Sequence, residues 1–204
     1  NTLTYDGQIG KHNINFVAGT AYQEENTNTL TAWGNEFSEP YFLQIQNAKT
    51  RDANSFEYKH AIMSYFGRLN YNYDEKYLLS AIVRRDGSSR LSKDKRWSTF
   101  PSVSLGWRID KEKFFPVSKD IINLLKLRAS YGEIGIDNVG DYAIQTTMDR
   151  NNMSYSFGNN IVYGSAISTF VNQNLEWERR ITKNIGLDIA MFGNRLEFSA
   201  EWFK

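Results

Sequence analysis

A regular alternation of apolar and polar side chains is the feature that most constrains how this chain folds. It is clearest in the stretch RWSTFPSVSLGWRI (96–109), where Ser102, Ser104, Gly106 and Arg108 separate Pro101, Val103, Leu105, Trp107 and Ile109. A period of two residues is that of a β-strand with one apolar and one polar face. Soluble β-sandwiches and membrane β-barrels both produce it, so the open question is whether protein or lipid covers the apolar face.

The same alternation recurs along the whole chain. We predict about eight strands, near residues 1–5, 13–22, 61–73, 77–86, 99–109, 125–131, 181–191 and 195–202. The expected fold class is therefore all-β, with antiparallel strands. Aromatic residues near strand ends, such as Tyr71, Tyr73 and Tyr77, suit a membrane–water interface.

The connections between these strands alternate in length. Three are short: DGQIGK (6–11), DEK (74–76) and FGN (192–194), the last with the Gly and Asn that a tight hairpin requires. Three are long, at roughly 25–60, 87–98 and 133–175. Short turns at one end and long loops at the other are typical of an outer-membrane barrel.

One connection on the short-turn side, residues 110–123, breaks this rule. Its segment SKDIINLL (118–125) predicts a short helix that is capped by Ser118 and has Asp120 in its first turn.

Composition excludes several classes of protein. The net charge of +1 gives no general affinity for nucleic acid, and the absence of cysteine excludes disulfides and thiolate metal sites. No run of about 18 apolar residues is present, which excludes a transmembrane helix but not a barrel. Because the chain starts at Asn1 and stops directly after an aromatic strand, we expect a piece of a longer chain.

Four stretches carry a resemblance to a known family. They are FGRLNYNYDEKYLLSAIVRRDGSSRL (66–91), RWSTFPSVSLGWRI (96–109), LKLRASYGEIG (125–135) and DNVGDYA (137–143). In this order they resemble the SusC/RagA-type TonB-dependent outer-membrane transporters of Bacteroidetes. Weaker similarity covers 10–19 and 174–203, so well over half of the chain is included. Leu91 and Ser92 depart from the family, which commonly has an aromatic residue and a glycine there.

The resemblance implies a transmembrane β-barrel of the 22-stranded, plugged type. Residues 1–204 would be part of its single barrel domain, a partial wall of about eight strands, and the plug domain would lie outside this chain. It further implies TonB-dependent import of oligosaccharides or peptides across the bacterial outer membrane. The expected partners are TonB, reached through the missing N-terminal part, a SusD-like surface lipoprotein as lid, outer-membrane lipid and lipopolysaccharide, and the glycan or peptide itself.

Two alternatives to this reading stay open. A complete eight-stranded barrel with a structural or adhesion role also fits about 200 residues, and it requires residues 1–5 to pair with 195–204. A secreted carbohydrate-binding β-sandwich requires its apolar faces to pack together.

No enzyme signature is present, and we expect neither a cofactor nor a metal. The only histidines, His12 and His60, lack clustered acidic partners in the sequence, and GEIG (132–135) lacks the spacing of a phosphate-binding loop. Ser88 and Ser89 lie beside Gly87 without a nucleophile elbow.

The candidate ligand-binding residues lie in the lumen or in the long loops. They are Arg84, Asp86, Arg90, Trp97, Asp137, Asn138, Asp141 and Tyr142. Arg84 and Asp86 share one strand face, where they either brace the wall as a charge pair or contact substrate. Arg85 takes the other face, so it is expected near the lipid headgroups, because arginine at the bilayer midplane costs about 2–4 kcal/mol.

The long loops also contain aromatic and amide side chains that suit either sugar binding or contact with a lid. They are Trp33, Tyr41, Phe42, Gln44, Gln46 and Asn47 in one loop, and Asn151, Asn152, Tyr155, Asn159, Asn160 and Tyr163 in another.

Overall fold

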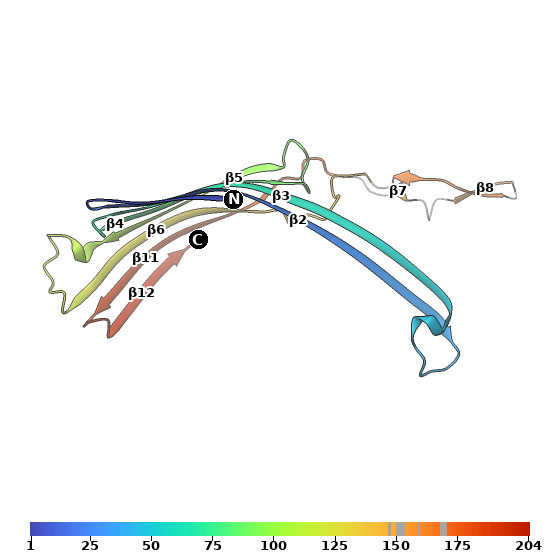
Figure 1. Ribbon diagram of the computed structural model, residues 1–204, viewed down its shortest axis with the longest axis horizontal. Coiled ribbons are helices and arrows are strands. Elements are labelled where there is room, and N and C mark those ends of the chain that lie inside the picture. The colour runs from blue at the N-terminus through green and yellow to red at the C-terminus, as the bar shows by residue number, and fades with distance from the viewer. Residues whose placement is uncertain (147, 150–153, 159, 168–170) are drawn as a thin grey trace.

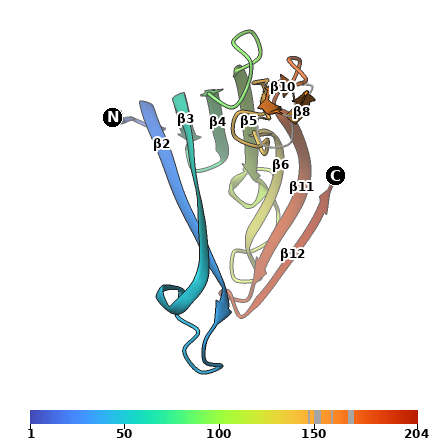
Figure 2. The ribbon, with the colours of Figure 1, turned by 90° about the vertical axis from the view of Figure 1, so that its right-hand side faces the viewer.

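A single curved antiparallel sheet of eight strands makes up most of the molecule (Figures 1 and 2). The computed structural model describes residues 1–204 except 147, 150–153, 159 and 168–170. The sheet strands are β1 (Thr2–Ile9), β2 (His12–Phe37), β3 (Ala48–Tyr73), β4 (Tyr77–Ser88), β5 (Trp97–Arg108), β6 (Ile122–Ile136), β11 (Glu178–Met191) and β12 (Leu196–Phe203).

The remaining elements belong to the connections. They are the 3₁₀ turns η1 (Ile45–Asn47) and η2 (Ile109–Lys111), and two small two-stranded sheets. In these sheets β7 (Met148–Asp149) pairs with β10 (Ala166–Ile167), and β8 (Ser154–Phe157) pairs with β9 (Asn160–Tyr163). No helix in the described part of the chain is long and apolar enough to cross a membrane.

Sheet order follows chain order, β1-β2-β3-β4-β5-β6-β11-β12, so successive strands always pair. The strands β1 and β12 are the two edges of this sheet, and they do not pair with each other. The closed eight-stranded barrel considered from the sequence is therefore wrong. Figure 2 shows the sheet as an open trough, with the two termini on opposite rims.

The turns at one end of the sheet are short, as predicted. Left-handed backbone conformations close them: Gly10 at φ 58°, Asp74 at 53°, and Phe192, Gly193 and Asn194 at 55–64°. The β2–β3, β4–β5 and β6–β11 connections lie at the opposite end of their strands, and the tip of the β2–β3 hairpin lies at the far right of Figure 1. The short turns at 10–11, 74–76 and 192–195 agree with the prediction, and the connection after β5 is the exception that the sequence also marked.

Two local predictions are wrong. Most of the loop expected at 25–60 is strand, because β2 and β3 continue their pairing as far as Phe37 and Ala48 and form a hairpin that projects beyond the rest of the sheet (Figure 1). Threonines and aromatic residues favour this extended backbone even though polar residues occupy both faces.

The helix expected at 118–125 is the second error. Ser118 does accept a hydrogen bond from the Asp120 N–H at its side chain, and its carbonyl accepts from Ile121 and Ile122. The chain then enters β6 at once, where Leu124 pairs with Ala190. Because β6 pairs with β11 from Ile122 onward, the segment forms a single hydrogen-bonded turn and no helix.

Burial differs sharply between the two sheet faces. Large apolar residues from β1, β5 and β11, such as Leu3 (70% exposed), Leu105 (55%) and Ile185 (54%), have no cover from the described residues. No second sheet packs on this face within the described residues, because both other sheets have only two strands. The β-sandwich alternative is therefore wrong as well.

Candidate functional site

The polar face of the sheet carries a line of hydrogen-bonded side chains that crosses four strands. Strand register aligns Asp6 of β1, Asn15 of β2, Asn70 of β3 and Ser80 of β4. Asn15 donates to Asp6 at 2.5 Å, Asn70 donates to Asn15 at 3.2 Å, and Ser80 donates to Asn70 at 2.7 Å. The same row continues through Ser104, Ser130 and Asn184.

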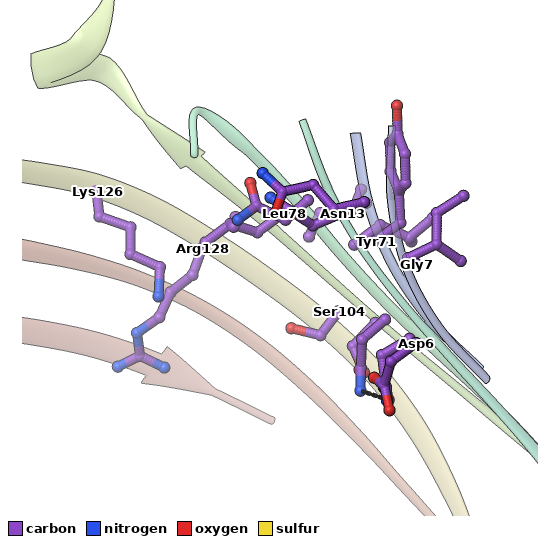
Figure 3. Close-up of a pocket in the computed structure, with 17 residues that line it drawn as sticks. Asp6, Gly7, Asn13, Tyr71, Leu78, Ser104, Lys126 and Arg128 are labelled. Carbon is purple, nitrogen blue, oxygen red and sulfur yellow. Dashed lines mark hydrogen bonds between the residues drawn. The ribbon is translucent and has the colours of Figure 1, made fainter. Parts of the chain in front are cut away.

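A hollow of about 640 Å³ lies over this row (Figure 3). It is lined from β1 through β6, by residues that include Asp6, Asn13 and Ser104, so the polar face is the concave side of the trough. Lys126 and Arg128, two residues apart on β6, add positive charge (Figure 3). Arg128 forms ion pairs with Asp188 at 3.3 Å and Glu201 at 3.1 Å.

The predicted pair Arg84 and Asp86 lies on this polar face. The Arg84 Nε donates to both carboxylate oxygens of Asp86 at 2.8 Å, and its Nη2 donates to the Ser64 Oγ at 3.0 Å. Ser64 and Asp86 are buried, at 2% and 8% exposure. This geometry corresponds to the first of the two roles considered from the sequence, a charge pair that braces the barrel wall. Because Asp86 is buried, it offers little surface to a ligand.

Four of the predicted residues gather at the long-loop end of the sheet. Asp141 accepts from the Arg90 Nε at 2.7 Å and lies 3.2 Å from the His60 Nδ1. Asp137 accepts from the Ser88 Oγ at 2.7 Å, and the Tyr142 hydroxyl accepts from the backbone N–H of Lys59 at 3.3 Å. We call this group, Arg90, Asp137, Asp141 and Tyr142 with their partners His60 and Ser88, the loop clamp.

The loop clamp fastens the DNVGDYA segment to β3 and to the end of β4. Tyr142 adopts a left-handed conformation (φ 60°), which turns the chain at this point. Asn138 is exposed, and Tyr142 is 39% exposed, so both remain accessible.

The Arg90 guanidinium, which donates a hydrogen bond to Asp141, holds the pKa of that carboxyl below its ordinary value. A carboxyl with a lowered folded-state pKa stabilises the fold fully above its unfolded pKa, about 3.9, and loses this contribution as the pH falls through the folded value. We therefore expect Asp141→Asn to speed limited proteolysis of the full-length protein within 137–146 at pH 7, and acidification below about pH 4 to do the same in the wild type. Equal cleavage rates at pH 7 in the variant and the wild type would contradict the clamp.

An apolar cluster that sequence reasoning missed supports the loop clamp. Leu91, Phe100 and Trp177 are buried together, with Val139 and Leu175 packed against them. The Trp177 indole also donates to the Arg96 carbonyl at 2.7 Å. Leu91, one of the two departures from the family pattern, is fully buried at the centre of this cluster. No sequence periodicity marks the cluster, because it joins strand β5 to two separate connections, β4–β5 and β6–β11.

Trp97 is the one predicted site residue that lies on the apolar face. It pairs with Gly87 across β4 and β5, stacks on Tyr65 (ring centroids 5.8 Å apart), and has the Arg85 guanidinium 5.6 Å from its ring centroid. The structure therefore separates Trp97 from Asp86 and the loop clamp. Arg85 lies on the side that the sequence predicted for it.

Aromatic residues mark both ends of the apolar face along β4. Tyr77, stacked with Tyr73, lies at the short-turn end, and the Tyr65–Trp97 pair lies beside Arg85. Arg85 follows Tyr77 by eight positions, which is about 27 Å of strand. At the usual barrel tilt this length corresponds to about 20 Å of membrane depth. Barrels of the outer membrane have an apolar band about 25 Å tall between two aromatic girdles.

These features define a class of structure: a section of an antiparallel β-barrel wall whose concave face is polar and whose convex face is apolar. The family model described as "TonB dependent receptor-like, beta-barrel" matches residues 1–204. The chain belongs to this family of TonB-dependent receptors.

Curated relatives agree with this assignment. The chain is 34% identical to "TonB-dependent receptor P3" of Formosa agariphila, over 100% of this chain and 20% of that protein. It is also 34% identical to "TonB-dependent receptor SusC" of Bacteroides thetaiotaomicron, over 95% of this chain and 19% of that protein. The chain thus spans about a fifth of the length of these relatives.

A solved structure shows the same fold. The structure of the RagAB peptide transporter superposes with a TM-score of 0.85 and 29% sequence identity, over 99% of this chain and 22% of that chain. The resemblance to SusC/RagA-type transporters drawn from the sequence is confirmed, as is the prediction of a partial barrel wall.

Proposed function

We propose that this chain forms part of the wall of a bacterial outer-membrane transporter that imports nutrients, oligosaccharides or peptides, at the expense of energy delivered through TonB. The observation that carries the proposal is the separation of two faces on one open sheet: a polar row from Asp6 to Asn184 on the concave side, and exposed apolar residues such as Leu105 and Ile185 on the other. A polar lumen and a lipid-facing surface require this separation.

In this proposal, residues 1–204 belong to one barrel domain, and the plug domain and the TonB-contacting segment lie elsewhere in the protein. Two observations support this division. The barrel family model matches residues 1–204, and the chain spans only about a fifth of the length of its relatives. The segment itself would perform no covalent chemistry and would need no cofactor.

The long-loop end would face the cell exterior, where we place a SusD-like surface lipoprotein as the lid. The matched structure is that of a peptide transporter, which supports a peptide as substrate. The family resemblance seen in the sequence leaves an oligosaccharide equally open. The residues proposed to touch substrate are the accessible ones of the loop clamp region, Asn138 and Tyr142. Arg84, Asp86, Arg90, Asp137 and Asp141 would act by holding the wall and loops in place.

The projecting β2–β3 hairpin offers a further surface for lid or ligand. Phe56 and Tyr58 stack on it with ring centroids 6.4 Å apart, and Trp33 is 39% exposed. Of the loop amides that suit either sugar binding or contact with a lid, Asn151, Asn152 and Asn159 lie outside the described residues.

Deletion of the gene for the full-length protein tests the proposed function. We expect uptake of one class of labelled oligosaccharide or peptide to fall to background in the deletion strain and to return with the wild-type gene. Because the energy would come from the inner-membrane proton gradient, a protonophore should stop the same uptake. Unchanged uptake across a panel of glycans and peptides, or uptake that persists after collapse of the gradient, would contradict the proposal.

A further inference from the structure

A notch on the apolar face lies over β1 to β4, at the level where β1 begins and near the middle of β4. Strand register places Leu3, Ala18, Gly67 and Val83 in one row, with the two small residues in the middle. The resulting hollow has a volume of about 610 Å³ and is lined mainly by apolar groups. A Cβ added at Gly67 would meet no atom within 4 Å, so the floor of the notch is open.

Tyr65 and Arg85 close the notch on its long-loop side. They pair across β3 and β4 in the row next to Gly67 and Val83, and both line the hollow. Phe16 and Leu69 form the next apolar row on the opposite side. The notch is therefore an apolar depression with a single cation at one end.

Arg85 is held by aromatic contacts and not by an ion pair. Its guanidinium lies over Trp97, which in turn stacks on Tyr65. No hydrogen bond or ion pair formed within the described part of the chain engages the Arg85 side chain, whereas the guanidinium of its neighbour Arg84 is bonded to both Asp86 and Ser64. The planar N–H donors of Arg85 are thus available, in a geometry that suits phosphate.

We propose that this notch binds an anionic membrane lipid, with the lipid phosphate on Arg85 and an acyl chain over Ala18 and Gly67. The inference rests on the proposed membrane location. It explains why an arginine occupies the apolar face: about 20 Å from the opposite girdle, Arg85 would lie at headgroup depth, where tyrosine and tryptophan also belong. A zwitterionic lipid fits the notch but has a compensating positive charge, so the site should prefer a net negative headgroup.

Photo-cross-linking of the full-length protein in phosphatidylcholine vesicles tests this proposal. Two tracers with the same diazirine-labelled acyl chain are compared, phosphatidylglycerol and phosphatidylcholine, and adducts are mapped by mass spectrometry to peptides of residues 61–85. We expect the phosphatidylglycerol tracer to label these peptides about three- to tenfold more than the phosphatidylcholine tracer. In Arg85→Gln this preference should disappear.

Three controls separate the possible outcomes. Arg68→Gln removes a cation of the opposite face beside Gly67 and should keep the preference. Gly67→Leu fills the notch without a clash at its Cβ and should reduce labelling by both tracers. Peptides of β11 that contain Leu187 and Ile189 should be labelled equally by both, because they report lipid contact alone.

Equal labelling of 61–85 by the two tracers, or a preference that survives in Arg85→Gln, would overturn the lipid site. If β11 is labelled, this failure leaves the proposed function intact. Absence of labelling on β11 with either tracer would instead contradict the lipid-facing wall itself.

Discussion

Replacing Asp110 by alanine is expected to lower the free energy of unfolding by about 3 kcal/mol, because it leaves a partly buried arginine without its partner. The side chain of Asp110 is 5% exposed. Its two oxygens accept from Arg108 at 2.8 and 2.7 Å, and one of them also accepts from the backbone N–H of Leu125 at 3.0 Å. One carboxylate thus ties the end of β5 to the start of β6 across the longest connection on the short-turn side.

Thermal unfolding of the full-length protein in detergent, followed by the loss of its compact form in gels, measures this effect. Asp120→Ala is the matched control, since Asp120 lies in the same connection, is exposed, and bonds only within its own turn. We expect a clear loss of stability for Asp110→Ala and a much smaller one for Asp120→Ala. Equal losses would show that Asp110 has no special role.

The pH dependence of stability gives an independent check. Burial raises the pKa of Asp110, but the hydrogen bonds from Arg108 and the Leu125 N–H outweigh it, so the pKa is lowered overall. The stabilisation is then fully present above the unfolded pKa, about 3.9, and is lost as the pH falls through the folded value. Removing the carboxyl should therefore flatten the part of the acid-unfolding curve below about pH 4.

The faces of the wall could be predicted from sequence because a period of two fixes which side chains lie together once a strand forms. Val103 and Leu105 fall on one side and Ser102 and Ser104 on the other whatever the partner strand is. The hairpin at 192–194 could also be predicted from a local signal, since Gly193 and Asn194 readily adopt the left-handed backbone conformation that the turn requires.

Features that depend on the register between strands could not be predicted from the sequence. The row from Asp6 through Asn15 and Asn70 exists because three strands align those residues, and a shift of one residue would turn them to the opposite face. The loop clamp likewise joins His60, Arg90 and Asp141 from distant parts of the chain. The projecting hairpin was missed because both its faces are polar, so its strands lack the alternation that marks the rest.

Val103→Arg should prevent or strongly impair assembly in the membrane, whereas Ser104→Arg should be tolerated. Both residues are exposed, and they are adjacent on β5. Val103 lies on the apolar face and pairs with Ala81, midway between Tyr77 and Arg85 on β4, so it lies near the middle of the apolar band. Ser104 lies in a polar row with Ser80 and Ser130. Arginine on the lipid-facing side costs about 2–4 kcal/mol near the bilayer midplane, a penalty that does not apply beside a watery lumen.

The measurement is the folded fraction of the full-length protein in outer-membrane preparations, read from heat-modifiable migration, so that it does not depend on transport. A large deficit for Val103→Arg with little change for Ser104→Arg identifies the apolar face as lipid-facing. The reverse result would mean that the polar face meets lipid and the apolar face lines the lumen. Equal tolerance of both would mean that neither face meets hydrocarbon, and exposed apolar residues such as Leu3, Leu105 and Ile185 would then need a protein cover. Because the two variants differ only in the face that carries the charge, the comparison isolates the property on which the proposed transporter wall depends.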